Sequence, residues 1–196
     1  MYKGSNLKVS SDEFKRSEIE TLLIHECQQG NIRSEEKLYR HFYGYVTAIS
    51  LRYASDKADA QEIVDDTFMK VFSNIGKFDP QQPFKGWLRK ITVNTAIDHL
   101  RRNKRYVHMI DIDHVSVSSN ECAVSKLSAE DLMQMISQLP DLQRFTFNMY
   151  EIEGYNHQEI AQQLDITESS SRVYLTRAKQ RLRELSEIYF GKGNGR

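Results

Sequence analysis

Five side chains in the first half of the chain combine an aromatic ring, an amide, a carboxylate and two cations. They are Trp87, Lys90, Asn94, Asp98 and Arg101. Steps of three or four residues place them on one stripe of a helix, the basic stripe. Cations hold phosphates, while rings and amides stack on and read unpaired bases, so this stripe predicts contact with single-stranded nucleic acid. Taken alone, Trp87 also fits a core position.

The residues just before this stripe add to the same chemistry. Phe78, Phe84 and Lys85 lie in or beside a loop that contains Pro80 and Pro83. Their rings and charge would supply stacking and phosphate contacts next to the stripe. The helix itself carries two further apolar lines, which predicts that it packs on two sides.

A preceding helix, from about Ser55 to Ile75, has an apolar core stripe and an acidic outer side. That outer side, the acidic face, holds Asp59, Glu62, Asp65, Asp66 and Met69. Carboxylates around an exposed methionine suit a basic protein partner, because Met packs adaptably and the charges steer association. A metal site is the weaker interpretation, since no His follows at helical spacing and no calcium loop is present.

The C-terminal part has the layout of a DNA-binding helix-turn-helix. Asn156 and Glu159 form a capping-box pair at the start of a short helix, with Tyr155 and Ile160 as its hydrophobic staple. A turn at 164–167 follows, and Thr167 caps a longer basic helix. An ordinary helical hairpin shares this spacing.

The longer helix divides into two faces. Ser171, Leu175, Ala178, Leu182 and Leu185 form its buried stripe. The opposite side carries the recognition face, which consists of Ser169, Ser170, Arg172, Val173, Thr176 and Arg177. Side chains near the helix N-terminus can reach base edges, and an apolar Val suits a thymine methyl group. Val173 is otherwise an ordinary exposed residue.

These segments require an all-helical chain. Spacings of three and four recur and strand-type alternation is absent, which predicts two small helical domains joined by a flexible linker. Two helices are expected over 17–54, then helices at 55–75, 84–105, 128–138, 141–152, 156–164 and 168–188. The domains are expected at 17–105 and 128–190, the second a winged-helix-like group of four helices. The linker covers 106–127, and polar tails cover 1–16 and 191–196.

Composition narrows the class of protein. The 196 residues are 39% hydrophobic and 28% charged, which favours small domains with much surface. Two widely spaced cysteines exclude a disulfide scaffold and a zinc ribbon, and they favour a reducing compartment. The chain shows neither an N-terminal signal nor an 18-residue apolar run, so we expect a cytoplasmic protein that does not insert into membranes.

Charge is segregated although 27 cations balance 27 anions. Seven cations lie in 85–105 and seven more in 172–196, while anions gather in 56–66 and 111–131. Two basic blocks predict two contacts with a polyanion, and the acidic blocks predict a basic protein partner. Each block alone also fits a solvated helix face.

Three segments together resemble a known family. They are DAQEIVDDTFMKVF, FKGWLRKITVNTAIDHLRR and the late LPDLQRFTFNMYEIEGYNHQEIAQQLDITESSSRVYLTRAKQRLRE. Their order and spacing are similar to those of bacterial sigma factors of the sigma-70 family. The resemblance is greatest to the extracytoplasmic-function (ECF) group, which retains only regions 2 and 4, and it covers about 21–105 and 128–188.

The resemblance implies a dissociable promoter-specificity subunit of RNA polymerase. The acidic face would dock on the clamp coiled coil of the core enzyme, whose flap is a further contact. The basic stripe with Phe84 and Lys85 would engage the −10 element, and the 78–86 loop would hold a flipped base. The recognition face would read the −35 element. An anti-sigma factor is an expected partner, and neither a cofactor nor a metal is implied.

Two residues depart from the family pattern. Asp165 stands where a turn Gly is common, and Ser171 replaces an apolar core residue, which would loosen the packing of the second helix.

An autonomous DNA-binding regulator is the main alternative, but the chain has no dimerisation heptads. An enzyme is disfavoured, because nucleophile–base sets and phosphate-binding loops are absent.

Overall fold

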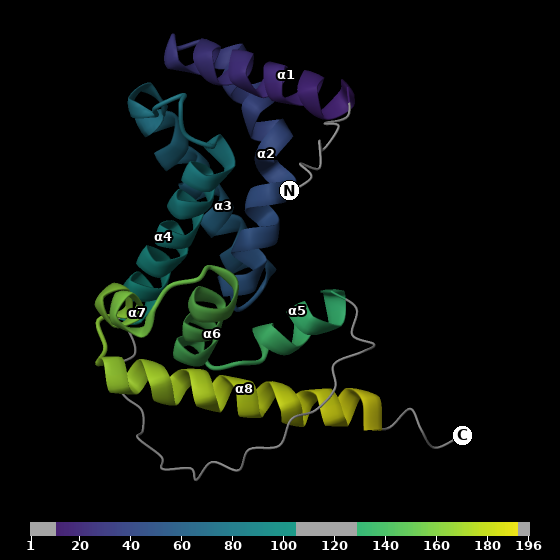
Figure 1. Ribbon diagram of the computed structural model, residues 1–196, viewed down its shortest axis with the longest axis vertical. Helices are drawn as coiled ribbons and strands as arrows, with labels where there is room; N and C mark the ends of the chain where they lie inside the picture. Colours follow the sequence, from purple (N-terminus) through teal and green to yellow (C-terminus); the bar gives the residue numbers. More distant parts are fainter. Residues whose placement is uncertain (1–10, 105–128, 192–196) are drawn as a thin grey trace, which may run out of the picture.

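The computed structural model describes residues 11–104 and 129–191, and within these ranges the regular structure is entirely helical (Figure 1). The expected all-α class is therefore confirmed. The 106–127 segment lies outside the described residues, as do 1–10 and 192–196. The second domain was expected to be winged-helix-like. The described ranges contain no strand, so they contain no β-wing.

The first domain begins with α1 (Ser11–Gln28) and α2 (Ile32–Tyr53). Helix α1 starts six residues earlier than the expected helix at 17. The two helices separate where expected, because Gly30 adopts a φ of 78° and the Asn31 side chain caps α2 by accepting hydrogen bonds from the Arg33 and Ser34 amides. Leu38, Phe42 and Val46 are buried at four-residue spacing on α2.

Helices α3 (Lys57–Asn74) and α4 (Phe84–Lys104) complete this domain. Asp56 caps α3 through its Oδ1, which accepts from the Ala58 and Asp59 amides at 2.8 and 2.9 Å. A 3₁₀ turn, η1 (Ile75–Lys77), leads into the loop before α4. The prediction that α4 packs on two sides is confirmed: Leu88 belongs to one buried cluster, while Val93, Ile97 and Leu100 belong to a second.

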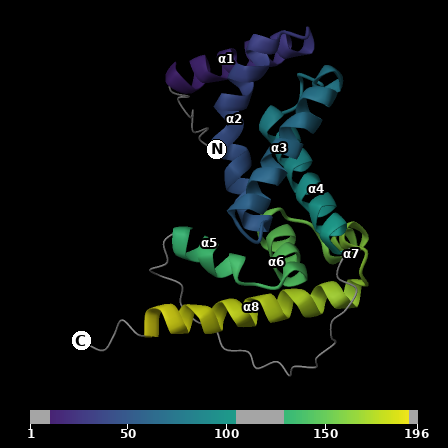
Figure 2. The same ribbon diagram turned by 180° about the vertical axis from the view of Figure 1, so that it is seen from behind.

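The second domain consists of α5 (Ala129–Ser137), α6 (Asp141–Phe147), α7 (His157–Leu164) and α8 (Glu168–Gly191). The helix expected over 141–152 is α6 continued by a π-helical turn, η2 (Asn148–Ile152). Figure 2 shows α8 lying along one end of the molecule, with α5, α6 and α7 between it and the first domain.

The two domains share one apolar cluster. Phe145, Met149 and Ile160 of the second domain lie in it together with Ile97 and Leu100 of α4. Helix α2 packs against α5 and α6, and α4 packs against α7. The domains are therefore in direct contact in this structure, and their relative position follows from that contact.

Candidate nucleic-acid and protein interface

The helix-turn-helix of α7 and α8 contains the capping residues that were predicted from the sequence. Asn156 Oδ1 accepts from the Glu159 amide at 2.9 Å, and Glu159 Oε2 accepts from the Asn156 amide at 2.8 Å, which confirms the capping box. Asp165 adopts the left-handed conformation, with φ of 54° and ψ of 51°. Asp tolerates this geometry better than most residues, so the turn forms without the common Gly.

The start of α8 is organised by Thr167. Its Oγ1 accepts from the Ser170 amide at 3.1 Å, as expected for a capping residue. The hydroxyls of Ser169 and Ser170 lie 2.9 and 2.8 Å from the same oxygen. The first turn of α8 is thereby fixed, and it holds the polar start of the recognition face in a single arrangement.

The recognition face lies on the outside of α8. Val173 is 46% exposed, and Arg172 is exposed although its guanidinium pairs with Glu168 one turn earlier. Thr176 and Arg177 are half-buried. The opposite stripe is buried at Leu175, Ala178 and Leu185, whereas Leu182 is half-buried. The two faces predicted for α8 are thus separated as expected.

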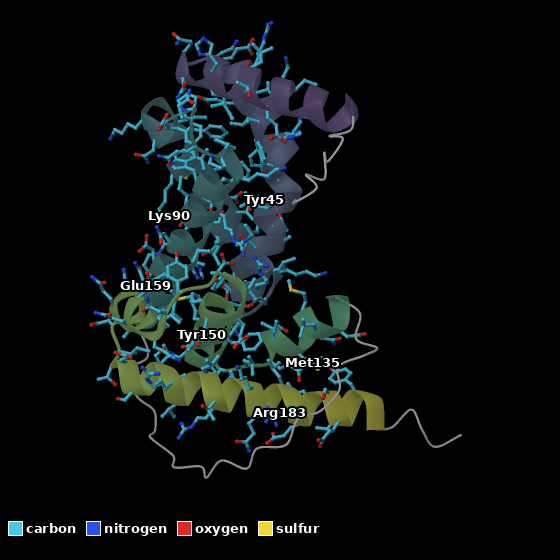
Figure 3. All side chains as sticks on the ribbon, viewed as in Figure 1. Tyr45, Lys90, Met135, Tyr150, Glu159 and Arg183 are labelled. Atoms are coloured by element: carbon cyan, nitrogen blue, oxygen red, sulfur yellow. The ribbon has the colours of Figure 1, made fainter. Side chains whose placement is uncertain are left out.

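Ser171 does not leave a gap in this packing. It is fully buried, and its Oγ lies 3.0 Å from Nδ1 of His157 on α7. The His157 ring in turn stacks on Tyr150, which Figure 3 labels, with 4.6 Å between ring centroids. Burial and the nearby Arg172 lower the pKa of His157 from its ordinary value of 6.5. A hydrogen bond therefore joins α7 to α8 where an apolar contact was expected.

The basic stripe runs along the outer side of α4. Lys90 and Arg101 are exposed, and Trp87, Asn94 and Asp98 are half-buried (Figure 3 labels Lys90). Asp98 is held by cations on both sides: Lys70 Nζ lies 2.8 Å from its Oδ2, and Arg101 Nη1 lies 3.6 Å from its Oδ1. The carboxylate orients these cations and lowers the net positive charge of the stripe.

The phenylalanines next to this stripe are placed differently from the expectation. Phe78 and Phe84 are 5% and 7% exposed, and they meet edge to face with centroids 5.2 Å apart. Phe84 is also the first residue of α4 and packs on Phe42 and Trp87. Their burial corrects the expectation that both rings offer stacking surfaces: they support Trp87 instead. Lys85 is exposed, as the expected contact requires.

A cavity lies between α1 and the loop before α4, with a volume of about 430 Å³. Its lining residues are Glu20, Thr21, Ile24, His25, Gln28, Phe78, Pro80, Gln82, Pro83, Phe84 and Lys85. Gln28 holds the loop in place, because its Nε2 donates to the carbonyls of Ile75 and Phe78 at 3.0 and 2.9 Å. The loop that was expected to capture a base therefore borders a cavity with polar and aromatic walls.

The acidic face occupies the outer side of α3. Met69 is 69% exposed, and Glu62 and Asp65 are also exposed. Asp66 is half-buried because Arg102 of α4 donates to its Oδ2 at 2.6 Å. Asp59 lies beside the start of α3, where its Oδ2 accepts from the Ser55 amide at 3.4 Å. All five residues share one side of the helix, as predicted.

Several charged residues have roles that helical periodicity alone did not indicate. Lys70 was not assigned to a site, yet it reaches Asp98 from α3. Arg89 belongs to the basic block but bonds to Glu153 of the second domain. Arg144 is 3% exposed and donates to the backbone of α2. The sequence shows that Arg89 and Arg144 are charged. It does not show that Arg89 bonds to Glu153 or that Arg144 is buried against the end of α2.

Two negative findings apply to the described ranges. Residues 11–104 and 129–191 contain no cluster of three His, Cys, Asp or Glu side chains that could hold a metal ion. No helix within them is both long enough and apolar enough to cross a membrane.

Comparison with known proteins places most of both domains in one family. The family described as Sigma-70 region 2 matches residues 38–106, and that described as Sigma-70, region 4 matches residues 129–182. The chain is 26% identical over 153 residues to the ECF RNA polymerase sigma factor SigM of Bacillus subtilis, covering 76% of this chain and 93% of that protein. It is 26% identical over 171 residues to the RNA polymerase sigma-H factor of Pseudomonas aeruginosa, covering 81% and 89%.

The chain also resembles solved structures of sigma factors. The sigma factor RpoE in complex with the anti-sigma factor NepR, from Bartonella quintana, is 21% identical, covers 80% of this chain and 99% of its own, and has a TM-score of 0.47. An engineered region 2 of sigmaE in complex with GTAAAA is 26% identical, covers 46% and 94%, and has a TM-score of 0.44.

Proposed function

We propose residue roles for this chain, which belongs to the sigma-70 family as an ECF sigma factor. Such a factor binds core RNA polymerase and directs it to promoters for transcription initiation. Region 2 lies in the first domain and region 4 in the second. The observation that carries the assignment is the recognition face, which stays free on α8 while the other side of that helix packs into its own domain.

In this proposal the recognition face reads the −35 element in the major groove. Ser169 and Ser170 lie at the N-terminal end of α8, where side chains reach base edges. Val173 would contact a thymine methyl group, and Arg172 would exchange its exposed pair with Glu168 for a base or a phosphate. An exposed ion pair of this kind contributes little stability, so it is easily broken on binding.

The basic stripe and the cavity would together engage the −10 element. Lys90 and Arg101 would hold phosphates of the opened strand, while Trp87 and Asn94 would face its bases. The cavity beside Lys85 has the size of a small-molecule site, which is enough for one unstacked base. Because Phe84 and Phe78 form its wall, they would enclose that base from the side rather than offer a free platform.

The acidic face would dock on the clamp coiled coil of core RNA polymerase, with the flap contacting region 4. Met69 would pack at the centre of the contact, and the carboxylates around it would steer a basic partner. We infer a cytoplasmic location, no enzymatic activity of its own, and an anti-sigma factor that covers these same faces. The 106–127 segment would join the two DNA-reading domains.

Run-off transcription tests the assignment. Core RNA polymerase would be assayed with and without the chain on a promoter library, and initiation should depend on the chain and select shared −35 and −10 motifs. Val173→Asp should lose the −35 preference, because a carboxylate would face the negatively charged groove. Ile188→Asp is the matched control, since it makes the same apolar-to-Asp change at an exposed residue of the same helix, beyond the recognition face.

Two other outcomes of this assay would contradict the proposal. If the core enzyme gains nothing while the chain alone shifts a specific duplex, the autonomous-regulator alternative holds, and the acidic face needs another partner. Initiation that depends on the chain but is unaffected by Val173→Asp would refute the −35 assignment alone.

A further inference from the structure

The last residue of α1 bonds to the loop that borders the cavity. Gln28 is half-buried, and its Nε2 donates to the Ile75 carbonyl at 3.0 Å and to the Phe78 carbonyl at 2.9 Å. A side-chain amide nitrogen carries two hydrogens, and both are used here. The opposite orientation would place the amide oxygen against two carbonyl oxygens, so this amide can bond to the loop in one way only.

The two carbonyls flank the turn from which the loop starts. Ile75 begins η1, and the Phe78 amide closes this turn by donating to the same Ile75 carbonyl at 3.1 Å. Within the loop, the Gln82 amide donates to the Asp79 carbonyl at 3.0 Å. Such short-range bonds shape a loop but do not fix its place in the fold. The bonds from Gln28 do so, because they come from a helix 47 and 50 positions earlier.

Phe78 extends this restraint to the basic stripe. Its ring centroid lies 5.0 Å from that of Trp87 and 5.2 Å from that of Phe84, and the latter two rings are 5.5 Å apart. Contacts between aromatic rings depend on their distance and relative orientation. A shift of the Phe78 backbone would therefore disturb the wall of the cavity and the support of Trp87 together.

Helix α1 also orients the cation beside the cavity. It packs against η1, and both ribbon views place the loop between α3 and α4 beside it (Figure 1, Figure 2). Glu20 lines the cavity eight residues before Gln28, which is about 12 Å along a helix. Its Oε1 lies 2.9 Å from His41 Nε2 and 3.8 Å from Lys85 Nζ. The Lys85 side chain is 50% exposed, so it is held near the cavity and can still reach a phosphate.

A loop that is ordered in advance favours the capture of a base. Unstacking a base from its neighbours costs free energy, and ordering loop residues at the same moment would add to that cost. Contacts that order the loop before binding remove the added cost. The bonds of Gln28 form within the chain itself, without DNA, so the cavity is shaped before a base enters it.

We propose that Gln28 is a positioning residue for base capture at the −10 element. It holds the loop before α4, and through Phe78 the wall of the cavity, in the arrangement that receives one unstacked base. This inference rests on the proposed function of the cavity. It extends that function to α1, a helix that carries none of the residues assigned to promoter contact. Position 28 must supply two N–H donors to the loop, and it acts through the loop.

Binding of holoenzyme to two forms of one promoter tests this role. The first form has the sequence selected by run-off transcription, and the second has an abasic site in the opened strand. The abasic site is placed at the −10 position where removing the base costs the wild-type holoenzyme most affinity. Gln28→Met keeps the length of the side chain and removes its N–H donors. It should weaken binding to the intact promoter by about tenfold and leave binding to the abasic promoter unchanged.

The variants include their own controls. Gln29→Met makes the same substitution at the neighbouring exposed residue, and it should bind both promoters as the wild type does. Unchanged binding to the abasic promoter would itself show that Gln28→Met is folded. Gln28→Glu also lacks N–H donors and has nearly the shape of Gln. It should give the same difference between the two promoters, because any general repulsion of DNA by the new carboxylate affects both forms.

The possible results separate the positioning role from a structural one. An equal loss of affinity for intact and abasic promoters would show that Gln28 supports only the fold, and no loss for either would show that the loop holds without it. Both results would overturn the proposal while leaving the proposed function in place. The proposed function fails in a different way, because the wild-type chain would then support no initiation with core RNA polymerase on any promoter of the library.

Discussion

Arg102 of α4 donates a hydrogen bond to Asp66 of α3, with 2.6 Å between Nη2 and Oδ2. This bond raises the pKa of the Arg102 guanidinium above its usual value. His99 and Glu62 meet in the same way one turn earlier, at 3.1 Å. The acidic face of α3 and the helix α4, which carries the basic stripe, are therefore connected along one edge, so a partner bound to the acidic face would lie next to the basic stripe.

Reversing the charge of Asp66 should weaken binding to core RNA polymerase. Asp66→Arg places a cation in the acidic face and opposite Arg102, so the affinity should fall on the order of tenfold, or about 1.4 kcal/mol. Folding should survive because Asp66 lies outside the apolar core and its pair with Arg102 is largely exposed, which thermal denaturation would check. Binding is measured by fluorescence anisotropy of labelled chain with core enzyme. Glu36→Arg, at an exposed site on α2, is the control, and normal binding by Asp66→Arg would refute the docking assignment.

Lys90 should contribute one phosphate contact to binding of the −10 strand. Lys90→Ala should reduce the slope of log affinity against log salt by about 0.7, the value for one phosphate on a single strand. The measurement is a salt titration of holoenzyme on a labelled single-stranded −10 oligonucleotide of the sequence selected by run-off transcription. Lys57→Ala removes an exposed cation at the start of α3 and should leave the slope unchanged. Equal slopes for Lys90→Ala and wild type would place the strand elsewhere.

The left-handed turn residue offers a test of backbone strain. Asp165→Gly should increase the free energy of unfolding by up to about 1 kcal/mol, because Gly adopts a φ of 54° without steric cost. The converse change, Gly154→Ala at a φ of 81°, should lower it by about 1 kcal/mol, since no neighbouring atom opposes the added methyl group and only the backbone resists it. Urea denaturation measures both. Destabilisation by Asp165→Gly would show that the Asp side chain contributes more than its conformation costs.

His157 should make the second domain sensitive to acid. Its pKa is lowered in the folded state by burial first and by Arg172 second, so the unfolded chain binds a proton more readily. The stability that this histidine contributes is therefore complete above about pH 6.5 and is lost as the pH falls below that value toward the lowered folded pKa. In urea denaturation from pH 7.5 to 5.5, His157→Gln should flatten this decline. The control His25→Gln, at an exposed site on α1, should leave the decline as in wild type. If the free energy of unfolding falls with pH equally in wild type and His157→Gln, the assignment to His157 is contradicted.

Local order was predictable wherever neighbouring residues decide it. The capping box of Asn156 and Glu159 and the cap at Thr167 each depend on groups within three residues, and both form as predicted. The left-handed Asp165 follows from the same short-range logic. The sides of α3 and α8 were equally predictable, because a helix repeats every 3.6 residues and sorts apolar from polar side chains by that period.

The tertiary structure alone decided which side chains meet across the chain. Ser171 looked like a packing defect until His157 was found beside it, and Phe84 looked like a free ring until Phe42 and Phe78 enclosed it. Arg89 lies in a block of cations that the sequence associates with phosphates, yet it bonds to Glu153, 64 positions later. Periodicity determines the side of a helix on which a residue lies. The partner depends on which helices pack together, and that is settled by burial summed over the whole molecule rather than by any local pattern.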